Sequence, residues 1–270
     1  MNDQIIPMHH RSSRPIRPRV LRILALSLLL LAIQPRKPLV AQTQFAGWLA
    51  TFQNYKLNKH LGVYFDGQLR STGQWKDVQQ IILRPGLNVY LTPALTATVG
   101  YAYIPNRRTL SGVSDLLAEH RSWEQLLLTH PLRSTHRTGG VAHGATLTHR
   151  LRLEQRYLPK PKVEGDGLTT NGHSYASRLR YFTRALLPLP AAPFTEGFYA
   201  ALQNEVFVNI GDPSAVNGKF FDQNRAYIAF GYRFTKQFDT EIGYVNQYIS
   251  GAGDNSTNNH ILQCATYIRL

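Results

Sequence analysis

Alternating arginines are the side chains of this sequence that could do chemistry most directly. Residues 149–157 read HRLRLEQRY, in which Arg150, Arg152 and Arg156 share one parity with Glu154. Because successive side chains of a β-strand point to opposite faces, the segment predicts a strand with one charged face and one mostly apolar face. Guanidinium groups bind carboxylates and phosphates through paired N–H donors, so a charged face of this kind can hold ion pairs or attract anions.

Similar alternation recurs along the chain and gathers further charges on one parity. Taking the apolar parity as lipid-facing, we expect these residues to face a lumen: Asp66, Arg70, Arg84, Arg150, Arg152, Glu154, Arg156, Arg178, Arg180, Arg184, Glu205, Arg225, Arg233 and Glu241. We favour a structural or interaction barrel, in which ion-pair networks fill a narrow lumen and stiffen the wall. A small anion-selective channel is the alternative, because surplus arginine lowers the barrier for anions.

A lipid-active outer-membrane enzyme is the third hypothesis, and it requires a nucleophile beside a base. His143, His149, His173, Ser174 and Ser177 supply suitable residue types, but their spacing selects no triad. We therefore expect no enzyme activity and assign no catalytic residue.

Cofactor and metal sites are not expected either. The chain has 10 His, but no HxH or HxxxH pair falls in one predicted strand. The single Cys264 excludes an intramolecular disulfide framework. No glycine-rich phosphate loop opens a helix.

The N-terminal residues have the features of a secretory signal peptide. Residues 1–22 are basic, residues 23–33 form a short apolar run, and cleavage is expected after Ala41. The alternatives are an uncleaved anchor and a start at Met8. We therefore expect a signal peptide at 1–41 and a barrel domain at 42–270. No later apolar run approaches the ~20 residues of a spanning helix, so a mature protein in a membrane must form a closed barrel.

Repeated alternating segments predict an all-β fold, a transmembrane antiparallel β-barrel. The expected strands are 45–54, 60–71, 78–91, 94–104, 121–131, 144–158, 173–187, 197–210, 220–234, 238–250 and 260–270. Residues 105–120 and 159–172 are expected to be loops, whereas Thr92-Pro93 and 235–237 are expected to form short turns. Because bacterial single-chain barrels have even strand numbers, we expect ten to twelve strands.

The basic composition does not point to nucleic acid. The formal net charge is +14, but residues 1–41 contribute +6 and leave +8 for the rest of the chain. Many of the remaining arginines lie inside strands and alternate with apolar residues, whereas nucleic-acid binders more often gather charge on a helix, a loop or one exposed sheet face.

Several motifs resemble one known family. They are HRLRLEQRY at 149–157, SRLRYFTRALLPL at 177–189, QNEVFVN at 203–209, FDQNRAYIAFGYRF at 221–234, IGYVNQY at 242–248 and HILQCATYIRL at 260–270. In this order they resemble the outer-membrane-barrel family known as domain of unknown function 2490, from Trp48 onward. The resemblance implies an outer-membrane barrel and brings no reaction, ligand or catalytic residue.

The same resemblance bears on location and partners. We expect the outer membrane of a Gram-negative envelope, with membrane lipid and the barrel-insertion machinery as partners and small anions as a further possible partner. Family members often end in an aromatic residue that the machinery reads, whereas this chain ends in Leu270. The oligomeric state is left open.

Overall fold

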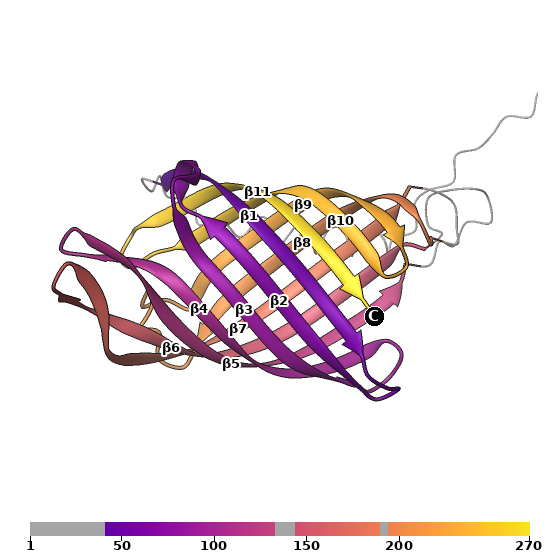
Figure 1. Cartoon of the computed structure of the whole chain (residues 1–270), viewed down its shortest axis with the longest axis horizontal. Helices are drawn as coiled ribbons and strands as arrows, with labels where there is room; N and C mark the ends of the chain where they lie inside the picture. The colour runs from indigo at the N-terminus through magenta and orange to yellow at the C-terminus, as the bar shows by residue number, and fades with distance from the viewer. Residues whose placement is uncertain (1–40, 133–143, 190–193) are drawn as a thin grey trace, which may run out of the picture. The chain divides into compact units, whose positions relative to one another are not determined.

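The computed structural model describes residues 41–132, 144–189 and 194–270, and these residues form an all-β fold (Figure 1). Residues 1–40, which hold nearly all of the expected signal peptide, lie outside the described residues. Ala41, the last residue of that expected peptide, begins the first strand.

Eleven strands are present in the described part of the chain. They are β1 (Ala41–Lys56), β2 (Leu61–Ser71), β3 (Val78–Tyr90), β4 (Leu95–Leu110), β5 (Val113–Pro131), β6 (Thr146–Glu164), β7 (Gly167–Pro188), β8 (Gly197–Ile210), β9 (Phe221–Thr235), β10 (Phe238–Ser250) and β11 (Ser256–Arg269). A short 3-10 turn, η1 (Gly73–Trp75), lies between β2 and β3. Among the described residues, no helix is long and apolar enough to cross a membrane.

The strands close into a barrel in sequence order, with β1 hydrogen-bonded to both β2 and β11. Consecutive strands pair antiparallel, as predicted, but β1 and β11 pair parallel, from Ala41 opposite Ser256 to Asn54 opposite Arg269. The reason is geometric. Strand direction alternates along the chain, so the first and eleventh strands run the same way. The number of strands in the described residues is therefore odd, whereas an even number was expected.

The expected loops at 105–120 and 159–172 are wrong. β4 and β5 pair out to Leu110 opposite Val113, and the turn between them is Ser111-Gly112, with φ of 52° and 82°. Two successive residues with positive φ make a tight hairpin turn that matches strand twist. β6 and β7 likewise pair out to Glu164 opposite Gly167. These segments are rich in charged, small and turn-forming residues, which suggested loops, yet their backbone groups pair across the hairpins.

The connections divide between two ends of the barrel. One end, which we call the hairpin end, carries the start of β1 and the β4–β5 and β6–β7 turns. The opposite end, which we call the C-terminal end, carries Leu270 and the β1–β2, β3–β4 and β9–β10 turns. Figure 1 shows both long hairpins projecting away from the C-terminus. The two predicted short turns, at Thr92-Pro93 and 235–237, both lie at the C-terminal end.

The outer wall is apolar and carries rings in two bands. Near the C-terminal end, Phe198, Tyr232, Phe234 and Phe238 contact one another in sequence, with centroid distances of 4.8 to 5.5 Å. Toward the hairpin end, His120 contacts Tyr101, Tyr103 and His173.

Strand β5 gives the spacing between the two bands. His120 lies on β5, and ten positions along the same strand, near the C-terminal end, His130 stacks on His149 with a centroid distance of 5.6 Å. A rise of about 3.3 Å per residue and a strand tilt near 40° separate them by about 25 Å along the barrel axis. The two bands are therefore about 25 Å apart on this strand.

Polar groups interrupt the outer wall, and one of them is centred on Glu124 of β5. Glu124 is exposed on β5 and accepts a hydrogen bond of 3.0 Å from Gln155 Nε2, while Ser122 Oγ donates to Gln155 Oε1 at 2.8 Å. Each side chain of this group therefore has at least one hydrogen-bond partner.

Candidate functional site in the barrel lumen

A cavity of about 670 Å³ lies inside the barrel and is lined by residues from near both ends. Thr72 and Arg108 line it toward the hairpin end, whereas Asn54 and Tyr267 line it toward the C-terminal end. Its lining therefore extends along much of the lumen, and the side chains between these limits are mainly arginines and amides.

Ten of the residues expected in the lumen line this cavity: Asp66, Arg70, Arg84, Arg150, Arg156, Arg178, Arg180, Arg184, Glu205 and Arg225. The structure places the other four inside the wall but not in the cavity lining. Arg152, Glu154 and Glu241 are buried, and Arg233 is half-buried against Asp239.

Glu154 is fully buried on β6 and has three arginine partners. Its carboxylate accepts hydrogen bonds from Arg180 Nη1 at 2.5 Å, Arg178 Nη2 at 2.7 Å and Arg121 Nη1 at 3.3 Å. These donors come from β7 and β5, the two strands that flank β6. A buried carboxylate needs such partners, because ionised groups are otherwise costly to remove from water.

Glu205 on β8 extends the network around the wall. Its Oε1 accepts hydrogen bonds from Arg150 Nη2 at 2.6 Å and Arg180 Nη2 at 2.7 Å. Arg225 Nη1 is farther away, 3.9 Å from Glu205 Oε2. Arg180 thus links Glu154 to Glu205.

Two members of this network, Glu119 and Arg121, were not among the residues that the sequence predicted for the lumen. Glu119 Oε1 accepts hydrogen bonds of 2.7 Å from both Arg121 Nε and Arg156 Nε. The expected loop at 105–120 hid Glu119. A signal was present, since Glu119, Arg121, Trp123 and Gln125 alternate on one parity and all four are buried.

Asp222 also joins the network, and parity alone could not have found it. Its Oδ2 lies 2.8 Å from Arg178 Nη1. The β8–β9 register shifts between Phe207 and Val208, and both Asp222 and Gln223 are buried. A β-bulge adds one residue to a strand and so turns the following side chains to the other face.

We call the connected set of ion pairs around Glu154 the acidic network. It comprises Glu119, Arg121, Arg150, Glu154, Arg156, Arg178, Arg180, Glu205 and Asp222. Separate buried pairs join Arg84 to Asp66 and Arg184 to Glu241, each at 2.5 Å. Asp239, another acid that the sequence analysis missed, pairs with Arg233 at 2.9 Å and Arg269 at 2.6 Å.

Some arginines have no carboxylate within 4.0 Å in the described part of the chain. Arg152 donates to Gln125 Oε1 at 2.7 and 3.0 Å, and its Cζ lies 4.5 Å from the ring of Trp123. Arg70 donates to the side-chain oxygens of Gln68 and Gln80. Amide oxygens and aromatic faces stabilise these cations but do not neutralise them.

The lumen therefore carries an excess of positive charge. Within the described residues, the arginines that line the cavity, are buried in the wall or pair with buried acids include Arg70, Arg84, Arg107, Arg108, Arg121, Arg150, Arg152, Arg156, Arg178, Arg180, Arg184, Arg225 and Arg233, and the buried acids are Asp66, Glu119, Glu154, Glu205, Asp222, Asp239 and Glu241. At least thirteen cations thus face seven anions.

Glycines on β3 and β4 make room for Trp123, which supports Arg152. A Cβ at Gly100 would overlap both the Pro85 carbonyl oxygen and the indole, and a Cβ at Gly86 would lie 2.8 Å from the same indole. The backbone of these two strands therefore forms the surface on which the indole packs.

The serine and histidine residues considered for catalysis do not come together. His149 Nδ1 lies 2.9 Å from Tyr181 Oη, and Ser177 hydrogen-bonds Tyr175. His143 lies outside the described residues. Within the ranges that the structure describes, no serine hydrogen-bonds a histidine side chain and no group of three or more metal-ligating residues is found.

This chain is similar to a known protein family and to individual known proteins. A protein of Methylorubrum extorquens strain AM1, described as uncharacterized, is 27% identical over 192 residues, covering 71% of this chain and 73% of its own. A solved structure of the NanC porin is similar with a TM-score of 0.42 and 11% identity, covering 77% of this chain and 88% of the porin chain. The family described as protein of unknown function (DUF2490) matches residues 45–258. The resemblance expected from the sequence is thereby confirmed, and the chain belongs to the DUF2490 family.

Proposed function

We propose that this protein is an outer-membrane barrel whose lumen passes small anions. The observation that carries the proposal is the cavity, because its lining reaches from near one end of the barrel to near the other and contains more arginine than acid. Surplus cationic side chains along a narrow path lower the barrier for anions and raise it for cations.

The outer wall supports the membrane part of this proposal. Leucine, valine and isoleucine side chains are exposed between the two bands of rings, among them Leu83, Leu87, Val99 and Ile228. The spacing of about 25 Å on β5 matches the height of the apolar band of outer-membrane barrels. An export signal at 1–41 would deliver the chain to the envelope.

Membrane lipid and the barrel-insertion machinery are the partners that follow from this proposal. Cell fractionation tests the location, and gel mobility of heated and unheated samples tests the folded barrel. Recovery from the soluble periplasm without a heat-dependent shift would contradict the membrane proposal.

A structural barrel is the second candidate, and the acidic network favours it. Glu154 and Glu205 hold arginines from β5, β6 and β7 along one part of the wall, which stiffens the wall and narrows any passage. In this alternative the cavity holds water but does not conduct.

Single-channel recording separates the two candidates. The folded protein is placed in a planar bilayer with a salt gradient, and insertion is confirmed independently. We expect steady current steps with a reversal potential that reports anion preference. A silent bilayer would favour the structural barrel, and cation-selective steps would contradict the role assigned to the arginines.

A further inference from the structure

We propose that Arg70, Trp48 and Arg225 form a binding site for small organic dianions with two carboxylates. This inference rests on the proposed access of anions to the lumen and assigns a substrate class to it. Trp48 lies on β1, Arg70 on β2 and Arg225 on β9. All three line the cavity.

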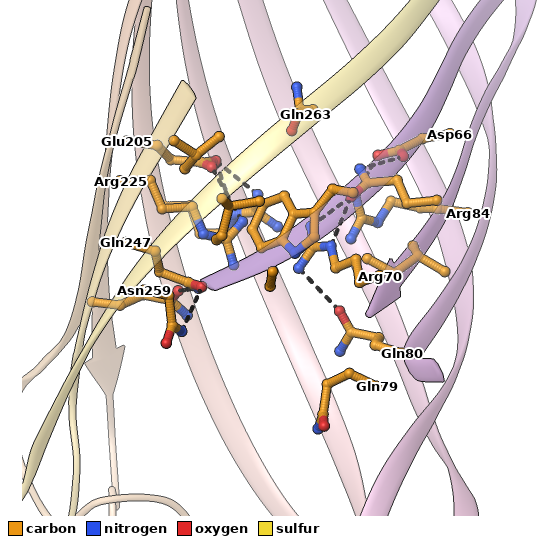
Figure 2. A pocket seen from close by; sticks show the side chains of 18 of the residues that line it. Asp66, Arg70, Gln79, Gln80, Arg84, Glu205, Arg225, Gln247, Asn259 and Gln263 are labelled. Carbon is orange, nitrogen blue, oxygen red and sulfur yellow. Dashed lines mark hydrogen bonds and ion pairs between the residues drawn. The ribbon is translucent and has the colours of Figure 1, made fainter. Parts of the chain in front are cut away.

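The two guanidinium groups share one indole. Arg70 Cζ lies 3.8 Å and Arg225 Cζ 5.2 Å from the ring of Trp48. Figure 2 shows Arg70 and Arg225 extending toward each other from opposite sides of the cavity. The indole therefore holds two cations near each other that would otherwise repel.

Neither cation is well neutralised by protein. Arg70 donates from Nε and Nη2 to Gln68 Oε1 at 3.0 and 2.5 Å and from Nη1 to Gln80 Oε1 at 3.0 Å, and both acceptors are uncharged amides. A guanidinium has five N–H donors, so Arg70 has donors left for a ligand.

Arg225 is also short of negative charge. Its nearest carboxylate is Glu205 at 3.9 Å, and that carboxylate already accepts from Arg150 and Arg180. When the Gln247 amide is turned so that its oxygen faces Arg225, it accepts from Nε and Nη2 at 3.2 Å each, which again supplies no charge.

The arrangement predicts the ligand. Two guanidinium groups close to one ring offer two carboxylate positions, because each planar fork can bind a carboxylate through paired hydrogen bonds. Amide side chains of Gln80, Gln247 and Gln263 also line the cavity and can hydrogen-bond the ligand. A dicarboxylate would satisfy both cations at once, whereas a monocarboxylate would leave one without a partner.

Succinate and butyrate form the matched probes, since both have four carbons and only succinate carries two charges. The mature, folded barrel is studied in detergent at pH 8, where succinate is a dianion. Calorimetric titration is expected to show succinate binding about tenfold or more tighter than butyrate, as expected for one additional charge-assisted contact. Equal affinities, or no binding of succinate, would overturn the proposal.

Three variants assign the binding to this site. Arg70→Gln and Arg225→Gln are each expected to weaken succinate about tenfold. Arg233→Gln is the control, because it removes the same charge from a residue outside the cavity lining while Asp239 keeps Arg269 at 2.6 Å. The control is expected to bind like the unmodified protein. Equal weakening in all three variants would mean a general charge effect and would overturn the site.

Intrinsic fluorescence gives a second readout, because the chain has only 3 Trp. Succinate is expected to change the tryptophan emission, and Trp48→Phe is expected to remove that change while calorimetry still detects binding. A response that persists in Trp48→Phe would place the ligand elsewhere.

Binding in detergent does not require conduction, so the two proposals fail separately. Anion-selective steps without succinate binding would support the proposed pore and contradict the proposed binding site. Succinate binding in a barrel that is silent in bilayers would support the site and contradict the pore.

Discussion

Two parts of the lumen wall hold arginine in different ways. In the acidic network, on β5 to β9, the buried Glu119, Glu154 and Glu205 each accept from two or more arginines, and Glu154 has three partners. Around Arg70, on β1 to β3, the partners are the amides of Gln68 and Gln80 and the indole of Trp48. We call this second region the amide wall.

We expect the acidic network to contribute mainly to stability and the amide wall mainly to anion binding. Removing a buried carboxylate that bridges arginines leaves those cations buried without a partner. The acidic network therefore stabilises the folded barrel. An arginine held by amides keeps its positive charge available to an anion. The following predictions test this contrast, from the largest expected effect to the smallest.

Glu154→Leu is expected to lower the free energy of unfolding by about 1 to 3 kcal/mol, because it leaves Arg121, Arg178 and Arg180 each short of a partner. The loss stays in this range because each arginine keeps a second acid. Urea titration of the folded barrel in detergent measures it. An unchanged midpoint would mean that water already solvates these arginines, and the network would then not differ from the amide wall.

Gly100→Ala is expected to cost about 1 to 2 kcal/mol, because the added Cβ would meet the Pro85 carbonyl oxygen and displace the Trp123 indole, which packs against β4. Arg152 would lose the ring that supports it. The same urea titration measures the effect. Gly73→Ala is the control, since its Cβ would meet nothing closer than 3.6 Å. Equal midpoints for the two variants would show that the indole yields without cost.

Arg70→Gln is expected to change stability by less than about 1 kcal/mol, because water in the cavity can take over the hydrogen bonds to Gln68 and Gln80. Its effect should appear in transport instead. We expect the ratio of anion to cation permeability to fall roughly threefold, read from the reversal potential in a salt gradient. A stability loss as large as that of Glu154→Leu would erase the distinction between the two regions.

Asp212, in the β8–β9 connection, supplies a reference outside both regions. The backbone N–H and hydroxyl of Ser214 donate to its carboxylate at 2.9 Å and hold its pKa below the ordinary value. The stabilisation of this turn is therefore present at neutral pH and is lost as the pH falls through the lowered pKa. Carboxyl NMR titration measures the pKa, and Ser214→Ala is expected to raise it. An ordinary Asp212 pKa in the unmodified protein would contradict the turn geometry.

Much of the fold could be read from alternation. The alternation of polar and apolar residues located each strand approximately, because β-strand side chains alternate wherever the two faces meet different surroundings. It also identified most of the arginines that the structure places inside the wall. Where alternation is irregular, as at 105–120 and 159–172, the ends of β4 to β7 near the hairpin turns were missed. At Asp222 a bulge reversed the parity.

The sequence by itself indicated many of the side chains that face inward, since in a regular strand that depends on strand geometry and on the burial of one apolar face. Tertiary structure alone decided which of them meet. Trp48 on β1 and Arg225 on β9 belong to strands that are not neighbours in the wall, yet their side chains lie within 5.2 Å across the lumen. Closure of the barrel brings such side chains together, because it fixes the width of the space that they share.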